Sequence, residues 1–71
     1  METDHQLIGK MGRLTSAIEP GEVGEVAVSI RGGSETFYAY AADAGEAIPK
    51  GTRVIVIEHE PPRTVIVSRY P

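Results

Sequence analysis

The run Val54, Ile55, Val56 and Ile57 places four apolar β-branched residues in succession in a chain of only 71 residues. If this run is a strand, its side chains point alternately to opposite faces, and both faces need cover. A domain of this size is near the lower limit for independent folding, because it hides only about 60% of the surface that its unfolded chain exposes. The sequence has no cysteine, so no disulfide can add stability. Stability must therefore come from hydrophobic burial and backbone pairing alone.

Glycine and proline divide the chain into five short apolar runs, near residues 10–18, 24–30, 35–42, 52–58 and 64–68. The second run is the clearest, since its apolar residues alternate with more polar ones in the period-2 pattern of a half-buried strand. No window repeats apolar residues at helical spacing, and the helix-tolerant stretch 41–47 holds at most one turn. The sequence therefore predicts an all-β domain over residues 9–71, preceded by a flexible tail over residues 1–8.

Five strands with short connections bury their apolar residues best when the sheet closes on itself, which also removes exposed edges. A five-stranded Greek-key barrel of the OB-fold type is the usual solution at this size. An SH3-like barrel is the near alternative. Alternation predicts that the core is lined by Val26, Val28, Ile30, Val54, Val56 and Val65.

Composition restricts the chemistry that the chain can perform. Ten acidic residues against seven basic ones give a net charge of −3, which argues against a general nucleic-acid binder. The two histidines, His5 and His59, stand in the tail and at the start of a predicted turn, where we interpret them as solvated surface residues. Neither has a convincing nucleophile or metal-ligand set beside it. We expect no catalytic residue, no metal and no cofactor.

The third run, which contains three of the four aromatic residues, is the one candidate binding surface. If Phe37 faces the core, Tyr38 and Tyr40 form an exposed pair on the other face, with Arg31 or Arg53 at its rim. Tyrosine is enriched at protein interfaces, so this set is the candidate partner-binding patch. The pair could equally stabilise the sheet by cross-strand packing. Base stacking is the third alternative, and the scarcity of neighbouring cations weakens it.

Two segments carry a resemblance to a known family: "LIGKMGRLTSAIEPGEVGEVAV" and "AIPKGTRVIVIEHEPPRTVIV". Their ordered turns and strands resemble the C-terminal soluble domain of NfeD-like proteins, from about Leu7 to Val67. The chain departs from the family pattern at Pro61 and Pro62, where the last hairpin often carries a glycine. The matching positions are Gly9, Gly12, Pro20, Gly21, Gly24, Val26, Val28, Ile48, Gly51, Val54 and Val56.

The resemblance implies an OB-fold that usually follows transmembrane helices in a longer chain. It also implies association with membrane scaffold proteins of the stomatin or flotillin type, through a domain that carries no catalytic residues. On this basis we expect a non-enzymatic interaction module, attached to the membrane through a segment absent from this chain and lying on its cytoplasmic side. A module that binds single-stranded nucleic acid is the alternative, and a small enzyme is the least favoured.

Overall fold

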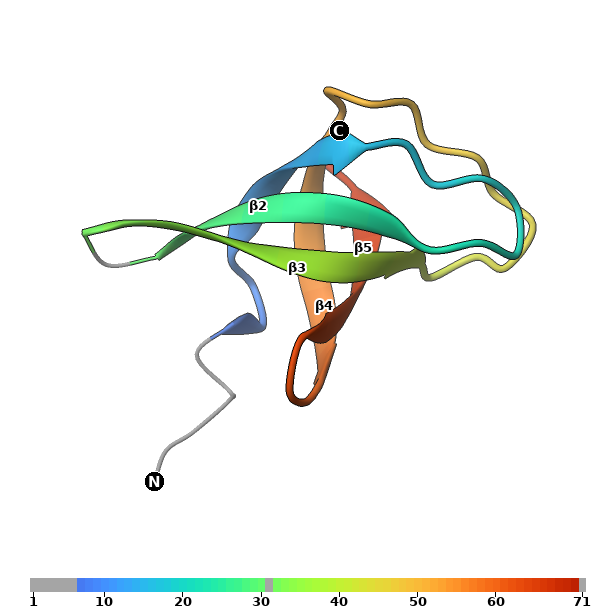
Figure 1. The fold of residues 1–71 in the computed structure, drawn as a ribbon. Coiled ribbons are helices and arrows are strands. Elements are labelled where there is room, and N and C mark those ends of the chain that lie inside the picture. The colour runs from blue at the N-terminus through green and yellow to red at the C-terminus, as the bar shows by residue number, and fades with distance from the viewer. Residues whose placement is uncertain (1–6, 31, 71) are drawn as a thin grey trace.

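The chain folds into five strands in a computed structural model that describes residues 7–30 and 32–70. The strands are β1 (Met11–Ser16), β2 (Gly24–Ile30), β3 (Gly33–Ala41), β4 (Arg53–Glu60) and β5 (Thr64–Arg69). They close into a barrel in the order β1-β2-β3-β5-β4, with β1 pairing with β4 (Figure 1). All neighbours are antiparallel except β3 and β5, which run parallel. This topology confirms the predicted all-β OB-fold barrel.

The barrel interior is apolar throughout. Five of the six predicted core residues are at most 1% exposed, and the prediction was wrong only for Ile30, which is partly buried. Ile30 pairs with Gly33 beside the β2–β3 hairpin, where the two strands project beyond the closed part of the barrel (Figure 1). The core also contains Phe37 and Ala39 of β3, together with five residues that were not predicted to be in it: Leu7, Leu14, Ile18, Ile48 and Val67.

The run of four β-branched residues lies in β4 and is covered unequally. Val54 and Val56 point into the core, as expected. Ile55 is half-buried on the outer face, where it stands between Met11 of β1 and Ser68 of β5. A bulge between Val56 and Glu58 leaves Ile57 on the surface with 40% exposure. Neighbouring strands therefore shield only part of the outer face.

Two adjacent loops close one end of the barrel. Ile18, in the β1–β2 connection, and Ile48, in the β3–β4 connection, form an isolated bridge with backbone hydrogen bonds of 2.9 and 2.8 Å. The two connections run side by side in Figure 1. Both isoleucine side chains are buried, so these loops supply core as well as connection. The predicted first strand, 10–18, is therefore a shorter strand followed by this bridge.

Two local expectations need correction. The strand β4 extends to Glu60, so His59 lies within a strand and not at the start of a turn. The stretch 41–47 agrees with the prediction, since it contains no helix and only a turn in which the amide of Glu46 donates to the carbonyl of Asp43 at 2.9 Å. Leu7, placed in the tail by the sequence analysis, packs in the core at 7% exposure. The rest of the predicted tail, residues 1–6, lies outside the described residues.

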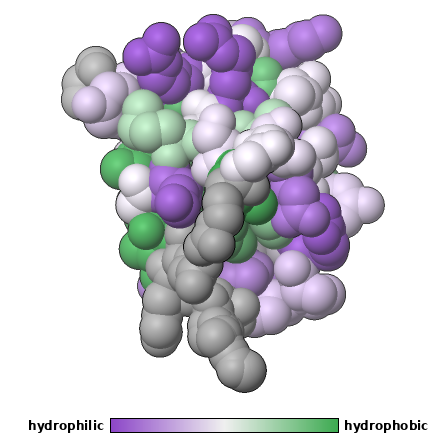
Figure 2. All heavy atoms as spheres, turned by 90° about the vertical axis from the view of Figure 1, so that its left-hand side faces the viewer, coloured by the Kyte–Doolittle hydropathy of each residue, from purple (hydrophilic) through white to green (hydrophobic). Residues whose placement is uncertain are grey.

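Viewed toward the projecting hairpin, the surface mixes hydrophilic and hydrophobic side chains. Figure 2 shows hydrophilic residues along the top and right of this face and smaller hydrophobic areas at its left. No helix within residues 7–30 and 32–70 has the length and apolar character needed to cross a membrane.

Candidate functional site

The outer face of β3 carries the exposed aromatic residues that the sequence predicted. Phe37 and Ala39 point into the barrel, with 5% and 0% exposure, while Tyr38 and Tyr40 are 52% and 43% exposed. The alternation confirms the predicted register, because a slip of one residue would exchange the two faces. The tyrosine pair is therefore accessible, and the core does not depend on it.

Neighbouring strands extend this aromatic pair into a broader surface. On the β5 side, Tyr38 stands opposite Thr64 and Tyr40 stands opposite Ile66. Both β5 residues are half-buried, so their outer atoms still reach the surface. We call these four residues, Tyr38, Tyr40, Thr64 and Ile66, the tyrosine surface. On the β2 side, Glu25 stands opposite Tyr38 and places an acidic group at its edge.

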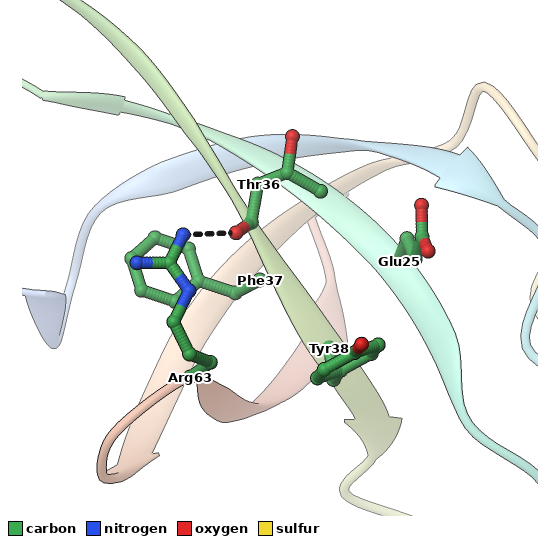
Figure 3. A pocket seen from close by; sticks show the side chains of 5 residues that line it. All are labelled: Glu25, Thr36, Phe37, Tyr38 and Arg63. Carbon is green, nitrogen blue, oxygen red and sulfur yellow. Dashed lines mark hydrogen bonds between the residues drawn. The ribbon is translucent and has the colours of Figure 1, made fainter.

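A depression of about 290 Å³ adjoins the tyrosine surface, and Figure 3 shows its lining. It is bounded by Glu25 of β2, by Thr36, Phe37 and Tyr38 of β3, and by Arg63 from the β4–β5 connection. The shared residue, Tyr38, makes the depression and the tyrosine surface continuous. Together they form the candidate contact area on this side of the barrel.

Arg63 is held in place by three contacts. Its Nη2 donates a 2.7 Å hydrogen bond to the carbonyl oxygen of Thr36, the dashed line in Figure 3. Its Cζ lies 4.8 Å from the centroid of the Phe37 ring, within cation–π range. Its Nη1 is 3.8 Å from a carboxylate oxygen of Glu35, although both side chains are about half exposed. The guanidinium therefore presents a positive charge, paired with Glu35, to the depression that Tyr38 also lines.

His59 supports the same end of the barrel from within. Its ring meets the ring of Phe37 edge to face, with centroids 6.1 Å apart and an interplanar angle of 80°. Its Nε2 lies 3.4 Å from the carbonyl oxygen of Pro62. His59 is therefore half-buried and packs against Phe37. Its interpretation as a solvated surface residue was wrong. Among the described residues, no group of three potential ligand side chains could hold a metal ion.

The predicted site residues do not all come together. Arg53 lies at the start of β4 and lines a different depression, shared with Arg13, on the wall formed by β1 and β2. Arg31 lies outside the described residues. The arginine beside the tyrosines is Arg63, which sequence reasoning missed. The position of Arg63 depends on the parallel pairing of β3 with β5. No local pattern in the sequence predicts that pairing.

The fold and surface define a small OB-fold module with an exposed aromatic wall. The model of the family described as the NfeD C-terminal domain matches residues 11–68 of the chain. The chain therefore belongs to the NfeD C-terminal domain family. A comparison with curated protein sequences finds no significant match.

Two solved structures are closely similar to the chain. One is the soluble domain of the NfeD protein YuaF from Bacillus subtilis, with a TM-score of 0.79, 26% identity, and coverage of 92% of this chain and 75% of that one. The other is the C-terminal domain of stomatin operon partner protein 1510-C from Pyrococcus horikoshii. Its TM-score is 0.78 at 28% identity, covering 100% of this chain and 98% of that chain.

Glycines at the matching positions have physical reasons in this barrel. Gly51 adopts φ +90° in the turn before β4, a conformation that L side chains rarely adopt. Gly24 begins β2 where the chain passes itself closely: a Cβ there would lie 2.7 Å from the carbonyl oxygen of Ala17 and 2.7 Å from Cγ1 of Ile18. The first glycine makes a turn possible, and the second allows the β1–β2 connection to pack against the core.

Proposed function

We propose that this domain is a non-enzymatic protein-interaction module, the soluble part of a membrane-anchored NfeD-like protein that binds a stomatin- or flotillin-type scaffold protein. The observation that carries the proposal is the tyrosine surface, an exposed aromatic area on a rigid barrel wall. Family membership gives its context, and one similar structure is named as a stomatin operon partner protein. The membrane segment and the cytoplasmic location are parts of this proposal.

The geometry of the tyrosine surface suits a protein partner. Tyr38 and Tyr40 stand on a β-strand paired on both sides, so binding would order little backbone. Preformed aromatic side chains give large contact area at low entropic cost, and tyrosine and arginine are frequent hot-spot residues. Arg63 stands at the rim of this surface with its guanidinium already fixed.

The same area is less suited to nucleic acid. Glu25 lines the depression beside Tyr38, and Glu35 pairs with Arg63, the one cation in that lining. A single-strand site instead combines stacking aromatics with a positively charged groove. The charges at this surface therefore favour a protein partner over the phosphate backbone.

The test compares binding and folding in a double variant, Tyr38→Ala/Tyr40→Ala. The wild-type chain and the variant are titrated against the stomatin- or flotillin-type protein of the same organism by isothermal calorimetry. We expect the variant to bind at least about tenfold more weakly, because truncated hot-spot residues commonly cost this much or more. Its thermal melt should stay close to that of the wild type, since the lost side chains lie outside the core.

Tyr70→Ala is the matched control. Tyr70 is the third tyrosine of the chain, it is 46% exposed, and it lies outside the tyrosine surface. We expect this variant to bind like the wild type. Full binding by the double variant would move the interface elsewhere on the barrel. Absence of binding by the wild type would overturn the partner class, and micromolar binding of a single-stranded oligonucleotide would favour the nucleic-acid alternative.

A further inference from the structure

Two arginines stand opposite each other on adjacent strands, away from the tyrosine surface. Arg13 of β1 and Arg53 of β4 are direct partners in the antiparallel register, and both side chains are exposed. Directly opposed residues place their Cβ atoms about 4.5–5.5 Å apart, and like charges in this position are destabilising. The fold therefore holds two positive charges together at a cost to its own stability.

No acidic side chain of the described residues forms an ion pair with Arg13 or Arg53. The Nη1 of Arg13 donates to the carbonyl oxygen of Gly51 at 3.3 Å, which leaves most of its donors available. Within residues 7–30 and 32–70, the Arg53 side chain has no hydrogen bond or ion pair. By contrast, Arg63 and Arg69 each pair with a glutamate, at 3.8 and 2.7 Å. The pair Arg13 and Arg53 thus differs from the other described arginines.

The pair borders a depression of about 370 Å³ on the outer wall of β1, β2 and β3. Ser29 and Ser34, direct partners across β2 and β3, supply hydroxyl groups to its lining. Ala27 and Gly12 complete the lining. Among the described residues, its lining contains no acidic group.

We propose that this depression, lined by Arg13, Arg53, Ser29 and Ser34, binds a phosphate ester. Two guanidinium groups and two hydroxyls offer several donors, which suits the tetrahedrally arranged oxygens of a phosphate ester better than the two coplanar oxygens of a carboxylate. A bound dianion or monoanion would also relieve the repulsion between the arginines. The site shares no lining residue with the tyrosine surface or with the depression beside Tyr38, so its test does not bear on the proposed partner.

A nucleic-acid strand is the less favoured occupant. Its binding would need cations spread along a groove and aromatic faces for the bases. This depression has two arginines and, among its described lining residues, no aromatic side chain. The chain as a whole carries a net charge of −3. The chemistry at the site therefore favours a single phosphate ester, whether on a soluble metabolite or on a lipid headgroup.

The test is a titration of ¹⁵N-labelled protein with glycerol phosphate, followed by NMR. We expect saturable shifts of the Arg13 and Arg53 side-chain Nε–H signals and of the Ser29 and Ser34 amides, weakening as salt is added. Arg53→Gln should weaken binding at least about tenfold, since it removes a charge-assisted hydrogen-bond donor. Lys10→Gln is the control, because it makes the same change of charge at an exposed residue outside the depression.

A second arm identifies the source of the phosphate. Vesicles containing phosphatidylglycerol are compared with pure phosphatidylcholine vesicles in a co-sedimentation assay, with the same two variants. The site is supported if binding in either arm is lost in Arg53→Gln and kept in Lys10→Gln. A response to glycerol phosphate identifies a soluble ester, and a response to the vesicles identifies a lipid headgroup. No response in either arm, or equal loss in both variants, would overturn the proposal. Tighter binding of a single-stranded oligonucleotide through Arg53 would assign the site to nucleic acid instead.

Discussion

Ile18 and Ile48 exchange two backbone hydrogen bonds, of 2.9 and 2.8 Å, although each lies in a loop outside the named strands. Their side chains are 2% and 0% exposed, which makes this bridge the apolar closure of one barrel end. Two residues outside the strands therefore contribute buried side chains to the core and a backbone pairing to the barrel end. The bridge therefore ties the long β3–β4 connection to the β1–β2 connection.

Truncating either isoleucine should destabilise the domain strongly. Ile18→Ala or Ile48→Ala removes three buried carbon atoms and leaves a cavity, so we expect a loss of about 2–5 kcal/mol in the free energy of unfolding. Urea titration followed by circular dichroism measures it, with m-values compared between variants. Ile57→Ala is the control: its side chain is 40% exposed, and we expect a loss below about 1 kcal/mol. Equal losses would show that the buried side chains of Ile18 and Ile48 contribute no more to stability than the exposed side chain of Ile57.

Gly24 should not tolerate even a methyl group. A Cβ at this position would lie 2.7 to 2.8 Å from two backbone oxygens, those of Ala17 and Ser16, which cannot move without displacing the loop. We expect Gly24→Ala to cost about 1–3 kcal/mol, the range for overpacking. Gly45→Ala is the matched substitution, because a Cβ there meets nothing within 4 Å and φ is not positive. Thermal melts of the two variants should separate clearly, and coincident melts would contradict the close approach.

The outer and inner faces of β3 could be predicted because they depend only on local alternation. Phe37 and Tyr38 followed the period of two, and so did Val54 and Val56 in β4. The same rule failed at Ile30, since alternation does not say where a hairpin leaves the closed barrel. The alternation of apolar and polar residues therefore predicts which face of the sheet each side chain takes. The strand topology decides whether other strands or loops cover that face.

The neighbours of the candidate site could not be predicted, because they depend on pairing between distant segments. Arg63 reaches Phe37 only because β5 runs parallel to β3, a contact that skips β4 in the sequence. Arg53 shares a strand with predicted core residues, but the winding of the barrel brings its side chain beside Arg13 and into a different depression. A single sequence carries little information about such non-local neighbours.

Arg63 should contribute to stability mainly through its contacts with β3. Arg63→Ala removes the hydrogen bond to Thr36 and the cation–π contact with Phe37, and we expect a loss of about 1 kcal/mol in the free energy of unfolding. Glu35→Gln, which removes only the exposed ion pair, should cost at most about 0.5 kcal/mol. Urea titrations of both variants at low and high salt test this ranking. A larger loss for Glu35→Gln would reverse the order of the two contributions.

The opposed arginines predict a substitution that stabilises the fold. Arg53→Gln removes one of two like charges that stand directly opposite each other, so we expect a gain of about 0.2–1 kcal/mol in the free energy of unfolding. The gain should shrink as salt is raised, because both side chains are exposed and their repulsion is screened. Urea titrations in 20–50 mM and in about 1 M sodium chloride, where the Debye length falls to about 3 Å, measure both effects.

Lys10→Gln makes the same change in net charge without an opposed partner in the strand register and should change stability less. A destabilising effect of Arg53→Gln at low salt would mean that the arginine makes a net favourable contribution to the fold, and that the two charges are not held together at a cost.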